Sequence, residues 1–106
     1  MTLAAAGITL KLETNGRHID DAAADRLRAL NVQCIQISVD GSTAAVHERA
    51  RPGSSFNAAI AAIDRLVERG LAPQVVFSPT RLNIHDMVAT YELAKQHGCS
   101  AFVTAS

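Results

Sequence analysis

The stretch 33–41, with the sequence QCIQISVDG, is the feature that most restricts how this chain can fold. Its odd-numbered positions from 35 to 39 are apolar, whereas Cys34, Gln36 and Ser38 point to the opposite face of a strand. A strand that is buried on both faces of a parallel sheet is apolar nearly throughout. The stretch therefore predicts a barrel strand with helices outside and a polar lumen inside. It ends on an Asp-Gly pair, at the end of the strand where barrel loops carry function.

Composition and charge narrow the class of protein. The 106 residues are enough for one small domain, and 48% hydrophobic with 19% charged residues is typical of a soluble globular chain. Ten basic and ten acidic residues cancel, which argues against nucleic acid or an anionic membrane as partner, because phosphate binding needs excess positive charge. No apolar run approaches the roughly 18 residues of a membrane span. Residues 1–7 lack the basic start of a signal peptide, so we expect a cytoplasmic protein.

The metal-binding residue types do not form a recognisable site. Cys34 and Cys99 make neither a CxxC nor a CxxxCxxC motif. In a cytosolic protein they are expected to be buried free thiols. The histidines match no HxxxH or HExxH spacing and are interpreted as surface or loop residues: His18, His47, His85 and His97. No metal ligands are predicted.

Hydrophobic periodicity and turn residues predict four strands that alternate with three helices. The long connection 42–54 is expected to hold a short helical turn at about 44–48 and, because of its length, side chains that reach a ligand. Asp20, Ser55 and Asn83 are the predicted N-caps, since short polar side chains accept from the first free amides of a helix. The strands are expected at residues 8–14, 32–39, 74–80 and 99–106, and the helices at about 20–30, 56–69 and 83–97.

Apolar stripes at helical spacing predict which helix faces pack on the sheet. On the strand 74–80, Val75 and Phe77 are expected on the helical side, and Gln74 and Ser78 on the lumen side. The expected stripes are Ala23, Leu27 and Leu30 in the first helix, Phe56, Ala59, Ile60, Ile63, Leu66 and Val67 in the second, and Ile84, Met87, Val88, Tyr91 and Ala94 in the third.

Strands that alternate with helices predict an α/β fold with a parallel sheet. The order is strand–helix–strand–helix–strand–helix–strand, with the helices on the outer face. Four strands cannot close a barrel, so the prediction is a partial, half TIM-type barrel. Residues 4–7 look like the tail of a further helix, and both chain ends look cut. The edge strands 8–14 and 102–106 are expected to offer unpaired backbone groups to a partner.

Four groups of residues resemble motifs of one family in the family's order. They are LETNG at 12–16, QISVDG at 36–41, HERAR at 47–51 followed by Ser55-Phe56, and Thr80 with Asn83. The ordered set covers nearly the whole chain. It resembles the middle of a radical S-adenosylmethionine (SAM) enzyme, in the SPASM-type branch of maturases and cofactor-biosynthesis enzymes.

The resemblance implies a segment of a larger enzyme core. Members of the family fold as a partial barrel of six strand–helix units, and a CxxxCxxC motif holds the [4Fe-4S] cluster that binds SAM. Residues 1–106 would form a single domain corresponding to about strands three to six of that core. The cluster motif and the glycine-rich SAM motif are absent. The parent family consists of oxidoreductases and maturases, but this chain alone is not expected to catalyse their reaction, and no catalytic residue is assigned.

The resemblance also implies SAM-facing residues. Ser38 matches a serine that hydrogen-bonds SAM, and its strand phase agrees. Arg51 matches an arginine that reaches the carboxylate or ribose region of SAM, with Arg49 as an alternative. Asn15 and Thr80 are expected at strand ends, where they line the SAM or substrate site.

Structural explanations compete with each of these assignments. The Ser38 hydroxyl can be satisfied within the sheet, and Arg51 can be a solvated loop arginine. Asn15 can serve only as a turn former, and an Asp-Gly turn lets Asp40 cap its own loop.

Two other functions remain open at this point. A non-enzymatic half-barrel would associate with itself or with the missing half through its strand edges. A flavodoxin-like binding domain would need apolar central strands and either an acidic pocket or a GxGxxG loop, and the sequence contains neither of these sites.

Overall fold

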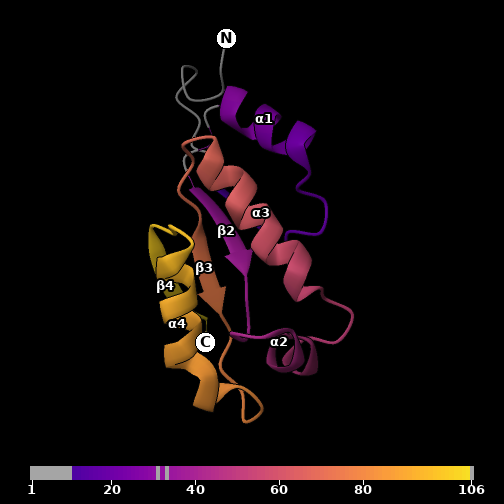
Figure 1. Cartoon of the computed structure of the whole chain (residues 1–106), viewed down its shortest axis with the longest axis vertical. Helices are drawn as coiled ribbons and strands as arrows, with labels where there is room; N and C mark the ends of the chain where they lie inside the picture. Colours follow the sequence, from indigo (N-terminus) through magenta and orange to yellow (C-terminus); the bar gives the residue numbers. More distant parts are fainter. Residues whose placement is uncertain (1–10, 31, 33, 106) are drawn as a thin grey trace.

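The structure of the chain is a computed structural model that describes residues 11–30, 32 and 34–105. The helical tail expected at 4–7, the start of the first strand and a turn at Asn31 lie outside the described residues. Strands and helices alternate as predicted (Figure 1). The strands are β1 (Lys11–Thr14), β2 (Cys34–Ser38), β3 (Gln74–Phe77) and β4 (Ala101–Thr104). The helices are α1 (Asp21–Ala29), α2 (Ala44–Ala50), α3 (Phe56–Glu68), the 3-10 turn η1 (Ile84–Asp86) and α4 (Met87–Gln96).

The sheet has the order β1-β2-β3-β4, and every neighbouring pair of strands is parallel. Consecutive strands therefore lie side by side, with no reversal of strand order. A flavodoxin-like sheet has such a reversal, where its ligand binds. The observed order is instead the arc of a barrel, as the sequence predicted.

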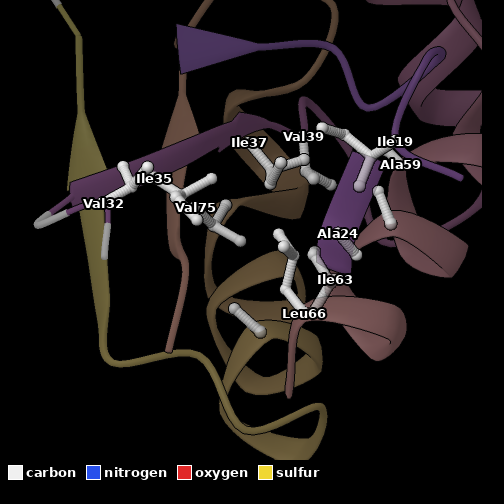
Figure 2. Close-up of a cluster of buried hydrophobic side chains, with 12 residues drawn as sticks. Ile19, Ala24, Val32, Ile35, Ile37, Val39, Ala59, Ile63, Leu66 and Val75 are labelled. Carbon is white, nitrogen blue, oxygen red and sulfur yellow. The ribbon is translucent and has the colours of Figure 1, made fainter. Parts of the chain in front are cut away.

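The hydrophobic core lies between the sheet and the helices (Figure 2). Ile35, Ile37 and Val39 all contribute to it from β2 and its end, which confirms the alternation in the stretch 33–41. On the lumen face, Gln36 donates from Nε2 to Oε1 of Gln74 over 3.1 Å, and Val76 is an apolar residue on the same face of β3. The helices contribute Ala24 from α1, Ala59, Ala62, Ile63 and Leu66 from α3, and Ala94 from α4.

Two of the three predicted N-caps are confirmed. Oδ1 of Asp20 accepts from the amide of Ala23 over 2.8 Å at the start of α1. Oγ of Ser55 accepts from the amide of Ala58 over 3.1 Å at the start of α3. The short helix in the long connection also forms, as α2.

Gly16 fixes how α3 approaches the turn after β1. Its backbone has φ 82°, a left-handed conformation, and a Cβ there would lie 2.9 Å from Cα of Ala59. Glycine alone meets both requirements without strain.

The packing face of α4 differs from the prediction. Ala94 is buried as predicted, but Ile84, Val88 and Tyr91 are exposed, by 51%, 68% and 44%, and Thr90, which was outside the predicted stripe, is buried. Thr90 can be buried because its hydroxyl donates to the carbonyl of Asp86 over 2.8 Å. The stripe in α1 is also partly wrong, because Ala24 is buried and Leu30 is 42% exposed. The stripe in α3 is confirmed for Ala59, Ile63 and Leu66, while Phe56, Ile60 and Val67 are half-buried at the margin of the core.

The strand β3 ends three residues earlier than predicted. The amide of Ser78 donates to a carboxylate oxygen of Asp40 instead of to the sheet, and Pro79 has no amide hydrogen to continue the ladder.

Cys34 and Cys99 are both free thiols. Among the described residues, no helix has the length and apolar character needed to cross a membrane.

Candidate site at the carboxyl ends of the strands

The segments that follow β1, β2 and β3 gather at one edge of the sheet, which we call the mouth (residues 15–20, 39–55 and 78–86). Parallel strands all end at the same edge, and the register places Thr14 beside Ile37 and Ser38 beside Val76. Asn15 therefore follows β1 at the level of Ser38. The mouth contains all four residues assigned to SAM or substrate, counting Ser38 at its inner margin.

Asp40 is the centre of the mouth, and all of its polar groups are hydrogen-bonded. Its side chain is 4% exposed. Oδ2 accepts from Nε of Arg51 over 2.8 Å, and Oδ1 accepts from the amide of Ser78 over 2.9 Å. The amide of Asp40 donates to Nδ1 of His47, and its carbonyl accepts from Nδ2 of Asn83. Asp40 thus joins its own loop to α2 and to the loop after β3, a larger role than the cap of one turn.

His47 is buried, which corrects its interpretation as a surface or loop histidine. It is 0% exposed, and its ring lies 5.9 Å from that of Phe56. Burial is the largest influence and lowers the pKa of His47 below 6.5, against the opposing effect of the Asp40 carboxylate. Gly41, which precedes α2, is the sequence feature that could have indicated the burial of His47. A Cβ on Gly41 would lie 2.5 Å from the amide nitrogen of His47. Only glycine admits the helix this close.

The hydrogen bonds of His47 fix its tautomer. Nδ1 accepts from the amide of Asp40 over 2.9 Å, so the proton resides on Nε2. Nε2 lies 2.9 Å from Oγ of Ser54 and therefore donates to it. A histidine in this tautomer cannot take the Ser54 proton, so the pair is not an activated serine nucleophile.

Asn83 is not the side-chain N-cap that its position predicted. It is 0% exposed and makes no side-chain capping bond at the start of η1. Nδ2 instead donates to the carbonyls of Asp40 and Ser78, both over 3.0 Å. Oδ1 accepts from the amide of Thr80 over 2.6 Å. Ser78 and Thr80 belong to the same loop as Asn83, but Asp40 lies 43 residues away in sequence, so local sequence rules do not detect that contact.

A second contact joins the same two loops. The amide and hydroxyl of Ser42 donate to the carboxylate of Asp86 over 2.6 and 2.9 Å. The loop after β2 and the loop after β3 are therefore held together by Asp40, Asn83 and this pair.

Ser38 is at the end of β2, and Arg51 is at the end of α2. Ser38 is 6% exposed and lies on the lumen face at the end of β2. Within the described part of the chain, its hydroxyl has no hydrogen-bond partner. Arg51 ends α2, and its side chain is 36% exposed although Nε pairs with Asp40.

Asn15 and Thr80 are exposed residues that shape turns. Oδ1 of Asn15 accepts from the amide of Arg17 over 2.9 Å. The Thr80 hydroxyl accepts from the amide of Leu82 and donates to Oδ1 of Asn83. Both residues lie at the mouth, and their side-chain oxygens serve the local backbone.

The residues present do not fit an iron–sulfur cluster. The whole sequence has two cysteines, and no group of three or more His, Cys, Asp or Glu side chains in the described ranges could hold a metal ion. Burial, reinforced by Asp64, raises the pKa of Cys99 to about 11, so this thiol stays protonated at neutral pH. A protonated thiol is a poor metal ligand.

The comparison with protein families decides the classification. The sequence model of the Radical SAM superfamily matches residues 1–100 of this chain. The chain belongs to the radical SAM superfamily. It is 32% identical over 99 residues to an AdoMet-dependent heme synthase of Methanosarcina barkeri, covering 92% of this chain and 28% of the relative. It is 33% identical over 98 residues to the mycofactocin maturase MftC of Mycobacterium ulcerans, covering 92% of this chain and 27% of the relative.

These relatives agree with the resemblance to SPASM-type maturases and cofactor-biosynthesis enzymes, and the chain spans just over a quarter of their length. A solved structure described as native anSMEcpe with bound AdoMet has a TM-score of 0.76 to this chain. The match has 18% sequence identity and covers 93% of this chain and 28% of the other. It confirms the partial-barrel fold and, with the family assignment, excludes the flavodoxin-like alternative.

Proposed function

We propose that this radical SAM chain forms part of the wall of a SAM and substrate site. In the proposal, Ser38 hydrogen-bonds SAM, Arg51 pairs with its carboxylate or ribose region, and Asn15 and Thr80 line the entrance. The chain corresponds to about strands three to six of the family's core. Its substrate would be recognised largely by parts of the enzyme outside residues 1–106.

The observation that carries the proposal is the link between Ser38, Asp40 and Arg51. Ser38 ends β2 on the lumen face, and Asp40 lies two residues later with Arg51 on its carboxylate. The hydroxyl of Ser38 and the guanidinium of Arg51 therefore lie at the same edge of the sheet. SAM offers a carboxylate and ribose hydroxyls, for which these two groups are suitable partners.

The chain alone is proposed to be inactive. A [4Fe-4S] cluster supplies the electron for reductive cleavage of SAM in this family, and the two cysteines here do not fit one. The reaction would therefore depend on a cluster-bearing segment. The two free thiols are compatible with a reducing compartment, and we propose the cytoplasm.

Calorimetric titration of the chain with SAM tests this proposal. We expect weak or undetectable heat, with a dissociation constant in the millimolar range, because the cluster that anchors SAM is missing. Micromolar affinity would contradict the proposed dependence on the cluster. In parallel, NMR titration with millimolar SAM should shift the amides of Ser38 and Arg51. Shifts confined to the outer helix α3 would contradict the proposed wall.

A second candidate function is a non-enzymatic half-barrel that self-associates at its β4 edge, and exposed apolar side chains favour it. Val88 and Tyr91 on α4 are 68% and 44% exposed beside Phe102 and Thr104 of β4. An apolar surface next to an unpaired edge strand is a site for association. Light scattering tests this candidate with Val88→Arg and with Ala45→Arg, an exposed control on α2. Association lost only in Val88→Arg would support it, whereas a monomeric wild type at high concentration would overturn it.

A further inference from the structure

The pairing of Arg51 with Asp40 uses only one side of the guanidinium. Nε of Arg51 lies 2.8 Å from Oδ2 of Asp40. Within the described residues, the terminal nitrogens of Arg51 make no hydrogen bond, and its side chain is 36% exposed. Guanidinium groups bind carboxylates through paired N–H donors. Arg51 therefore has a donor edge available after its contact with Asp40 is made.

Asp40 is itself held so that it can fix the orientation of another side chain. Its carboxylate accepts from the main-chain amide of Ser78, and its own amide and carbonyl are bonded to His47 and Asn83. The carboxylate thus has little freedom to follow a moving arginine. A charge-assisted bond to such a fixed acceptor restricts the rotamers of the long arginine side chain.

We infer that Asp40 is a positioning residue, which holds Arg51 through Nε and keeps its terminal nitrogens available for the carboxylate of the bound ligand. The inference deepens the proposed function and rests on it, because the anionic group is taken to be the carboxylate of SAM. It assigns Asp40 an indirect role: the residue acts through Arg51 and makes no contact with SAM.

The variant Asp40→Asn tests the inference. An amide has nearly the same size and keeps an acceptor, but it ends the charge-assisted bond with Arg51. The matched control is Asp25→Asn, because Asp25 also pairs with the Nε of an arginine, at 2.6 Å from Arg69, but far from the mouth on α1. Amide shifts of the strands verify that each variant is folded.

The first readout needs no ligand. In the full 106-residue chain, the Nε–H proton of Arg51 should exchange slowly with solvent, and it should exchange about tenfold faster in Asp40→Asn, which is the size expected for loss of a charge-assisted bond. Asp25→Asn should leave it unchanged. An Arg51 Nε–H that exchanges equally in the wild type and Asp40→Asn would overturn the positioning role.

The second readout separates that role from the proposed SAM site. Millimolar SAM is titrated by NMR against the wild type, Asp40→Asn, Arg51→Ala and the double variant, with methylthioadenosine as a probe that lacks the carboxylate. We expect Asp40→Asn to weaken SAM binding about tenfold, to leave methylthioadenosine binding unchanged, and to have no effect when Arg51 is already alanine. Equal losses for both probes would overturn the inference. If the Nε–H of Arg51 exchanges slowly in the wild type but the wild type does not bind SAM, the proposed function is overturned and the positioning role stays supported.

Discussion

The amide of Asp40 donates to Nδ1 of His47 over 2.9 Å, and this bond determines the protonation of a fully buried ring. A proton on Nδ1 would remove the acceptor and leave a buried amide unpaired, which is costly. It would also place a positive charge near the guanidinium of Arg51. The mouth is therefore built around neutral His47.

Acidification should destabilise the chain through His47. Because burial lowers its pKa below the ordinary value of 6.5, the unfolded chain binds the proton more readily than the folded chain. The stabilising contribution is complete above pH 6.5 and is lost as the pH falls through the lower pKa of the folded state. Urea denaturation between about pH 8 and pH 5 should show the unfolding free energy falling on the acidic side.

The variant His47→Phe isolates this contribution. It should cost about 1–3 kcal/mol at neutral pH, because the Asp40 amide loses its acceptor, and it should flatten the pH dependence around 6.5. His85→Phe, on the exposed turn η1, should keep the wild-type profile. Parallel profiles for the wild type and His47→Phe would show that other groups cause the acid sensitivity.

Replacement of Asn83 by aspartate should be strongly destabilising. The new carboxylate would face the carbonyls of Asp40 and Ser78, which now accept from Nδ2, and acceptors would oppose acceptors. We expect a loss of about 3 kcal/mol or more in the unfolding free energy. The control Asn57→Asp, exposed in the first turn of α3, should change stability by less than about 1 kcal/mol. A mild effect at Asn83 would mean that the two loops are not held together by its amide.

Two glycines with the same backbone conformation allow the cost of backbone strain to be measured separately from the cost of close packing. Gly16 and Gly53 have φ of 82° and 84°, but a Cβ at Gly16 would contact α3 at 2.9 Å, whereas a Cβ at Gly53 would have no heavy atom beyond its chain neighbours within 4 Å. Gly53→Ala should cost about 1–2 kcal/mol from the left-handed backbone. Gly16→Ala should cost about 1–3 kcal/mol more because α3 must move. Thermal or urea denaturation measures both, and equal losses would refute the close packing of α3 on this turn.

Cys99 should react slowly while the chain is folded. Burial raises its pKa from 9.0 to about 11, so near pH 8 its thiolate fraction is about 100-fold lower than that of an ordinary cysteine. In a Cys34→Ser background, iodoacetamide should modify native Cys99 about 100-fold more slowly than the denatured chain, and the rate should rise up to about pH 11. Similar rates in both states would show that the thiol is not shielded.

The strands and their faces could be predicted because each depends on a local pattern. Alternation in 33–41 assigned Ile35, Ile37 and Val39 to the core, and burial on one face of a sheet has a period of two residues. The caps Asp20 and Ser55 were predictable for the same reason, since their hydrogen bonds span three residues.

The contacts at the mouth could not be derived in this way. Asn83 was assigned to its own helix, but its amide bonds to the carbonyl of Asp40, 43 residues away in sequence. On α4, apolar spacing predicted that Val88 and Tyr91 are buried, but both are exposed. Ala94 was in the predicted stripe and is buried, but Thr90 was not, and its burial depends on the hydrogen bond from its hydroxyl to the carbonyl of Asp86.

The bonds that Asp40 and Asn83 make across the mouth also bear on local unfolding. Opening of the loop after β2 would break the contacts of Asp40 with Ser78 and Asn83, so the loop after β3 would lose its own anchors at the same moment. Segments joined in this way open as one cooperative unit with one free energy. We therefore expect the two loops to unfold as a single foldon, although α3 and β3 lie between them in the sequence.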